Sequence, residues 1–123
     1  MMSWRIGDAG FRMGLSARVP AVLATTLRPW LERWLAQHDL GVSRIGGWAV
    51  HPGGPRILSA VEQALELAPD ALANSRALLA THGNMSSPSV LMLLRELARN
   101  NTPLPWLALA FGPGLSAELA LFR

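Results

Sequence analysis

Proline and glycine divide this chain of 123 residues into short apolar segments, and their positions limit where helices and strands can begin and end. The most restrictive group is His51-Pro52-Gly53-Gly54-Pro55-Arg56, which directly follows a short apolar run. Its glycines permit positive φ angles and close approach of backbone, while Pro55 suits the first turn of a helix. The group therefore predicts a strand that ends near His51 and a helix that begins at Pro55.

Hydrophobic spacing and turn residues predict the other elements of the chain. Pro29 should kink or restart the first of the long helices. The order of elements predicts an α/β fold, with helices packed on a mixed sheet and ligands at the C-terminal ends of its parallel strands. We expect strands at 11–15, 44–50, 105–111 and 116–122, and helices at 19–37, 55–67, 69–83 and 86–99.

Composition excludes several classes of protein. Half of the residues are apolar, 15% are charged and no cysteine is present, so neither disulfides nor thiolate metal sites can form. The three histidines are too far apart in sequence for a metal site, and the net charge of +3 comes from scattered arginines, which does not favour nucleic-acid binding. No signal peptide and no apolar run of bilayer length is present. We therefore expect a cytoplasmic protein with no metal, no nucleic-acid partner and no membrane span.

Two polar residues in glycine-rich settings are candidate functional groups, although each has a simpler structural explanation. His51 could be an ordinary histidine after a strand, and Asn84, which follows Gly83, could cap a helix C-terminus. Their surroundings favour a functional role. Asn84 lies 33 positions after His51, in Gly83-Asn84-Met85-Ser86-Ser87, and Phe111-Gly112-Pro113-Gly114 follows near the end.

Together these three groups resemble the C-terminal half of the chalcone and stilbene synthases, which are type III polyketide synthases. The resemblance implies the C-terminal half of a thiolase-like fold and an acyltransferase that needs no cofactor, because its substrates are CoA thioesters. It also implies that His51 and Asn84 hydrogen bond to the thioester oxygen of malonyl-CoA and stabilise the enolate formed on decarboxylation. Ketoacyl synthases that initiate fatty-acid synthesis are similar but fit these motifs less well, and they remain an alternative.

The resemblance also implies substrate-binding residues. Gly53 and Arg56 would contact the pantetheine arm through the backbone, and the Arg56 side chain would also meet CoA phosphates or else be simply solvated. Met13 stands where plant chalcone synthases have a gatekeeping phenylalanine, and Ser86 matches a residue of the cyclisation pocket. The loop of Phe111, Gly112, Pro113 and Gly114 would shape the floor of that pocket.

The missing cysteine limits what the chain can do alone, because the family carries its acyl chain on a cysteine nucleophile. We expect residues 1–123 to form a single unit that lacks the cysteine-bearing N-terminal half, and to be inactive without it. The chain would be a fragment of a synthase that joins malonyl-CoA to an acyl-CoA starter, or else a natural noncatalytic partner subunit. Met1-Met2 stands where a family member would be mid-chain, which favours a fragment.

The helix at 88–99 is apolar nearly all round, so we also expect a homo-oligomer. The residues expected at or beneath its contact are Leu91, Leu93, Leu94 and Leu97. The sequence does not identify the starter, the number of extensions or the mode of cyclisation.

Overall fold

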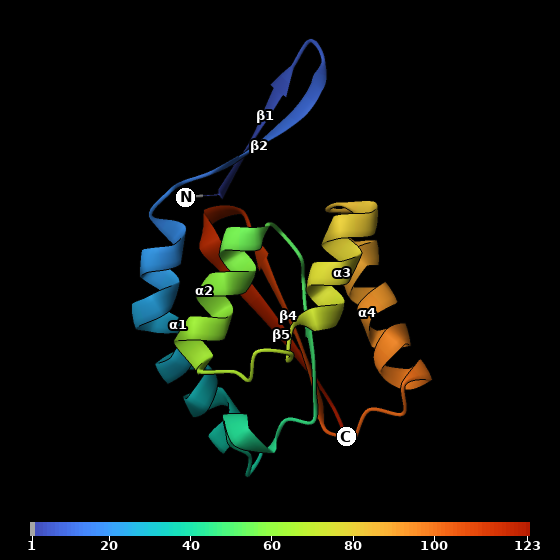
Figure 1. Ribbon diagram of the computed structural model, residues 1–123. Coiled ribbons are helices and arrows are strands. Elements are labelled where there is room, and N and C mark those ends of the chain that lie inside the picture. The colour runs from blue at the N-terminus through green and yellow to red at the C-terminus, as the bar shows by residue number, and fades with distance from the viewer. Residues whose placement is uncertain (1) are drawn as a thin grey trace.

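The computed structural model describes residues 2–123, which form a three-stranded mixed sheet flanked by helices and preceded by a hairpin (Figure 1). The hairpin consists of β1 (Met2–Gly7) and β2 (Gly10–Leu15). The sheet consists of β3 (Gly47–Val50), β4 (Trp106–Gly112) and β5 (Ser116–Phe122). The helices are α1 (Val19–Ala36), α2 (Pro55–Leu65), α3 (Ala73–His82) and α4 (Ser87–Arg99), and the short 3-10 turns are η1 (Val42–Arg44) and η2 (Pro113–Leu115).

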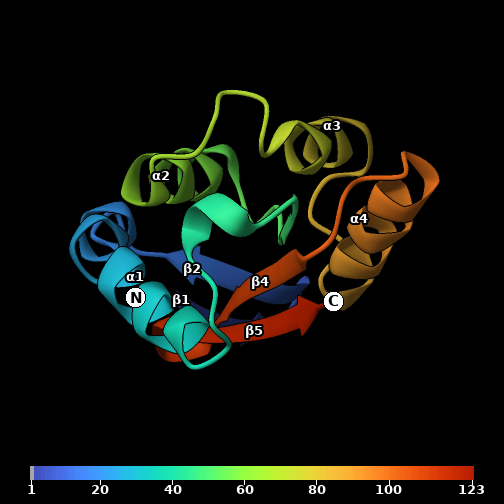
Figure 2. The same cartoon turned by 90° about the horizontal axis from the view of Figure 1, so that it is seen from below.

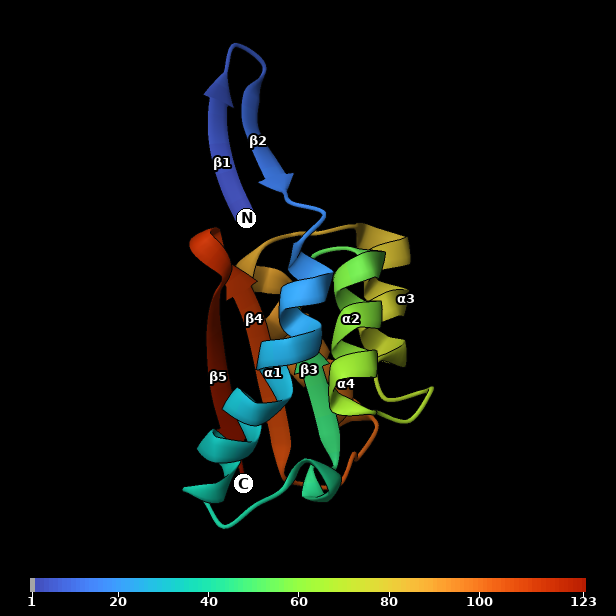
Figure 3. The same ribbon diagram turned by 90° about the vertical axis from the view of Figure 1, so that its left-hand side faces the viewer.

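The order β3-β4-β5 places β4 in the centre of the sheet, parallel to β3 and antiparallel to β5. Val50, the last residue of β3, is paired with Leu109. The C-terminal ends of β3 and β4 therefore lie side by side, at the end of the molecule where α1 and α2 begin (Figure 3). The hairpin projects from this same end, and β1 contacts η2.

Alternating side chains of β3 and β4 separate the core into two parts. One face of the sheet packs with α1 and α2 through Trp48, Val50, Leu107 and Leu109. The other face, through Ala49 and Ala108, packs with Leu93 and Leu97 of α4 and Leu78 of α3. The chain runs in order through α2, α3 and α4, each in contact with the next (Figure 2). This wrapping brings the start of α4 to the C-terminal end of the sheet.

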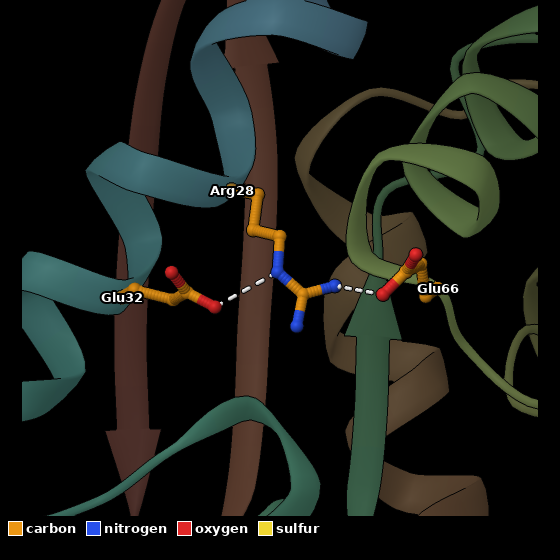
Figure 4. A network of polar contacts seen from close by, with 3 residues as sticks. All are labelled: Arg28, Glu32 and Glu66. Atoms are coloured by element: carbon orange, nitrogen blue, oxygen red, sulfur yellow. Dashed lines mark hydrogen bonds and ion pairs between the residues drawn. The ribbon is translucent and has the colours of Figure 1, made fainter.

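Helix α1 continues through Pro29 as one element, although an interruption is expected there from sequence. Pro29 is exposed, and so is Thr25, whose carbonyl loses its helical partner; water can therefore satisfy that carbonyl at little cost. The inner side of α1 is apolar and buried. Arg28 connects α1 to the end of α2, because its guanidinium lies 2.8 Å from Glu32 and 2.7 Å from Glu66 (Figure 4).

The expected α/β fold with a mixed sheet is confirmed, but several element boundaries differ. Strand β1 is not expected from the sequence at all. Strand β3 starts at Gly47 instead of residue 44, because the chain turns through η1 first. Helix α3 starts at Ala73, because Pro69 and the residues after it form a turn. No helix within residues 2–123 is long and apolar enough to cross a bilayer.

Candidate active site

His51 is held at the C-terminal end of β3 by its own backbone. Its N–H donates to the carbonyl of Leu109 on β4 at 2.8 Å, and its carbonyl accepts the N–H of Gly53 at 2.9 Å. The side chain is half-buried, and burial lowers the pKa of the imidazole; hydrogen bonding with Asn84 raises it, but burial is the larger effect. The imidazole is therefore neutral at pH 7 and has one N–H donor and one lone pair.

Asn84 lies in the connection between α3 and α4, and its side chain reaches His51. It does not act as the helix cap: Gly83, at φ 69°, ends α3 and donates its N–H to the carbonyl of Leu79 at 3.0 Å. The Oδ1 atom of Asn84 instead accepts the N–H of Ser86 at 2.9 Å. That bond identifies the oxygen end of the amide, so the NH₂ group is the end of Asn84 that can donate.

Ser86 adopts a backbone conformation that is costly for any residue with a side chain, with φ 62° and ψ −142°. Such strain amounts to roughly 1–3 kcal/mol and persists only where the surroundings enforce it. Here it aims the Ser86 N–H at Asn84. Ser86 directly precedes α4, but its hydroxyl makes no capping hydrogen bond to the helix.

A pocket of about 190 Å³ joins these residues at the C-terminal ends of β3 and β4. Of the ten described residues that line it, seven are expected from sequence: His51, Gly53, Asn84, Ser86, Phe111, Gly112 and Pro113. Sequence reasoning missed Ser87, Val90 and Ala110 as pocket residues. Val90 could have been found, since it lies one helical turn after Ser86 and Ser87.

Two other expected site residues, Arg56 and Gly114, do not line this pocket. Arg56 is exposed on the first turn of α2, beside a separate depression of about 340 Å³ that also contacts Pro20 and Gln63. Gly114 is exposed in η2, where its φ of 72° serves the turn before β5. Met13 is part of β2, but its side chain lies outside the part of the chain that is described.

The pocket combines neutral donors with apolar walls. Apart from His51, none of the described residues that line it is titratable. Beside His51, a Cβ atom on Gly53 would lie 3.8 Å from Cδ2 of the ring, an ordinary contact distance. Among the described residues no cluster of three or more histidine or acidic side chains could hold a metal ion. The arrangement is suited to stabilising negative charge on a ligand oxygen by hydrogen bonding.

Comparison with known sequences places the chain among polyketide synthases. All of residues 1–123 match the description "chalcone and stilbene synthases, C-terminal domain". The chain is 46% identical to 1,3,6,8-tetrahydroxynaphthalene synthase of Streptomyces peucetius, over all of this chain and 33% of the relative. It is 31% identical to a putative chalcone synthase of Bacillus subtilis, over 99% of this chain and 34% of the relative. The chain thus spans about a third of the length of these relatives.

Solved structures agree with this placement. The polyketide synthase PKS-I of the brown alga Ectocarpus siliculosus matches with a TM-score of 0.91 and 30% identity, over 98% of this chain and 34% of that one. The bacterial type III tetrahydroxynaphthalene synthase of Streptomyces coelicolor A3(2) matches with a TM-score of 0.84 and 36% identity, over 98% and 35%. The chain belongs to the chalcone and stilbene synthase family of type III polyketide synthases, and it corresponds to the family's C-terminal domain.

Proposed function

We propose that this chain supplies the oxyanion-stabilising half of a type III polyketide synthase active site. In this role His51 and Asn84 hydrogen bond to the thioester oxygen of malonyl-CoA. The observation that carries the proposal is the meeting of these two side chains in one pocket, at the ends of parallel strands, whose described lining carries no charged group. The enolate would then condense with an acyl group delivered by an acyl-CoA starter.

The chemistry needs donors rather than a charged acid or base. When malonyl-CoA loses carbon dioxide, the carbon–carbon bond breaks and its electron pair moves into the thioester, so that negative charge develops on the carbonyl oxygen. Two N–H donors fixed in advance stabilise this charge, and losing one such donor costs about 3 kcal/mol. The lowered pKa of His51 supports this role, because the ring remains a neutral donor at pH 7. The apolar lining favours the change from a carboxylate to neutral carbon dioxide.

Residues around the pocket would guide the rest of the substrate. The pocket volume of about 190 Å³ accommodates the malonyl thioester end of the substrate but not the whole pantetheine arm of CoA. We propose that the arm passes Gly53, which presents no side chain to it, and that Arg56 meets CoA phosphates in the neighbouring depression. Ser86, the Phe111-Gly112-Pro113 wall and, from the hairpin, Met13 would limit the size of the growing chain.

The nucleophile must come from elsewhere, because the chain contains no cysteine. We propose that residues 1–123 act as one unit together with a cysteine-bearing N-terminal half, to which the acyl starter is attached. The same absence favours a second candidate function, that of a noncatalytic partner subunit. Alone, the chain should neither gain mass on incubation with acyl-CoA nor make a polyketide; acylation of the purified chain, seen by intact mass, would refute this.

A chimera tests the catalytic assignment directly. In it this chain replaces the matching C-terminal third of the Streptomyces peucetius synthase, and carbon dioxide release from labelled malonyl-CoA is measured. His51→Ala and Asn84→Ala should each lower the rate about a hundredfold or more. His82→Ala and Asn100→Ala remove the same side-chain types from exposed positions outside the pocket and should leave it unchanged. Rates within threefold of the parent chimera for both pocket variants would contradict the proposal.

A further inference from the structure

Two buried serines make hydrogen bonds that the proposed function does not yet explain. Among the described side chains, the fully buried polar ones are Ser75 on α3 and Ser89 on α4, each with 0% of its surface exposed. A buried hydroxyl is costly unless it is hydrogen bonded. The hydrogen-bond partner of each serine therefore indicates which part of the backbone that serine holds in place. Neither serine lines the pocket.

Ser75 acts on the peptide unit that carries His51. Its hydroxyl donates to the carbonyl of Val50 at 2.7 Å. The N–H at the other end of this same planar unit belongs to His51 and donates to Leu109 at 2.8 Å. Because carbonyl and N–H point in opposite directions across a trans peptide, α3 and β4 hold the unit from both sides. The backbone of His51 is thereby fixed where β3 ends.

Ser89 acts in the same way on the peptide unit that follows Asn84. Its hydroxyl accepts the N–H of Met85 at 3.1 Å, and its own N–H donates to the carbonyl of Ser86 at 3.0 Å. The N–H of Ser86 in turn donates to Oδ1 of Asn84. Ser89 therefore holds the strained turn in the conformation that orients the Asn84 amide.

We propose that Ser75 and Ser89 are positioning residues, one for each oxyanion donor. The proposal rests on the proposed function, since it names what sets the geometry of the His51 and Asn84 pair. Each serine is rigidly packed in a helix, and each bonds the one peptide unit adjacent to a donor. Two donors that act on a single oxygen must be held to a fraction of an ångström, and loss of that alignment lowers the rate of the chemical step.

A purely structural role of the two serines predicts a different effect of their removal on stability and on kcat. If the serines only satisfy buried backbone groups, their removal lowers stability while the surviving folded enzyme works at the normal rate. If they position the donors, removal lowers kcat with little change in KM, because the serines touch no substrate and the donors that they align stabilise mainly the transition state.

The test uses the same chimera. Ser75→Ala and Ser89→Ala should each lower kcat for decarboxylation about five- to thirtyfold, with KM within twofold of the parent, and Ser75→Thr should recover most of the loss because it keeps the hydroxyl. Thr81→Ala is the control: like Ser75, Thr81 donates its hydroxyl to a backbone carbonyl, that of Ala77 at 2.9 Å, but away from the pocket. If Ser75→Ala does not fold, Ser75→Cys, which fills the site with a weaker donor, should show the same loss.

The outcomes separate the two proposals. Normal kcat in both alanine variants, beside large losses in His51→Ala and Asn84→Ala, overturns the positioning role and leaves the proposed function standing. Normal rates in all four variants overturn both. A second readout needs no turnover: in the 123-residue chain, NMR titration of the His51 ring should give a higher pKa in Ser75→Ala than in the parent, because a loosened imidazole gains solvent. An unchanged titration curve in Ser75→Ala contradicts the positioning role.

Discussion

Gly46 offers the sharpest test of how the sheet is assembled. It lies between η1 and β3, and a Cβ atom built on it would lie 2.0 Å from the carbonyl oxygen of Pro103 and 2.8 Å from its carbonyl carbon. Ordinary contact begins at 3.4 Å, so a methyl group requires a displacement of about 1.4 Å. Both obstructing atoms are backbone, and no side-chain rotation can relieve the contact.

The cost of Gly46→Ala follows from this geometry. Overpacking a close contact costs typically 1–3 kcal/mol, and the shift also strains the bond from the Gly46 N–H to the carbonyl of Pro105, at 2.8 Å, worth about 1 kcal/mol. We therefore expect a loss of about 2–4 kcal/mol in the free energy of unfolding. At about 4 °C per kcal/mol for a chain of this size, Tm should fall by roughly 8–16 °C.

A neighbouring glycine provides the control. Gly41 lies on the other side of η1 with an extended backbone, φ −122° and ψ 166°, and a Cβ atom on it would meet nothing within 4 Å. Gly41→Ala should be neutral, or stabilising by about 0.4–1 kcal/mol through the lower entropy of the unfolded chain. Thermal and urea unfolding monitored by circular dichroism compare the two variants. A Tm for Gly46→Ala within 3 °C of the parent would show that the close approach is not needed.

Three further predictions concern the site and its surroundings. Burial lowers the pKa of His51, so below about pH 6.5 the unfolded chain binds more protons than the folded one. The free energy of unfolding should therefore fall as pH drops from about 6.5 toward the lowered pKa. His51→Gln should remove this pH dependence in urea titrations. In thermal unfolding, Ser86→Gly should keep or raise Tm by relieving positive-φ strain, whereas Ser87→Gly, at the first position of α4, should lower the free energy of unfolding by up to about 1 kcal/mol. Leu91 is 67% exposed on α4, so we expect the 123-residue chain to self-associate through this apolar surface. Light scattering should show a smaller species for Leu91→Glu than for the parent. A monomeric parent would contradict the prediction.

Much of the fold could be predicted because proline and apolar spacing mark the elements locally. Pro55 and Pro88 stand in the first turns of α2 and α4, as their fixed φ angles predict. Strand β1 was missed because its sequence has no clear alternation and its only paired strand is β2. The turn at Asp8-Ala9-Gly10, where Gly10 has a φ of 110°, was the available signal for a hairpin.

The site shows where reasoning from sequence ends. His51 and Asn84 could be paired only through the family resemblance, since no periodicity connects residues on two different elements. Arg56 follows His51 closely in the chain but lies at a separate depression, because α2 begins at Pro55 and turns the next side chain away. From the sequence, Ser75 cannot be distinguished from any other polar residue of a helix. Only the packing of α3 against β3 shows that it is buried.

On the proposed function, the two halves of the reaction depend on different parts of the enzyme. The charge that develops during decarboxylation lies on one oxygen, and the groups that stabilise it, His51 and Asn84, are held by backbone bonds to Leu109 and Ser86 within this chain. Carbon–carbon bond formation needs an acyl group on a thiol, and the chain has none. Decarboxylation should therefore be sensitive to changes at the ends of β3 and β4 and at the start of α4, even in a synthase whose acylation by the starter remains normal. The oxyanion site can thus be dissected separately from the nucleophile.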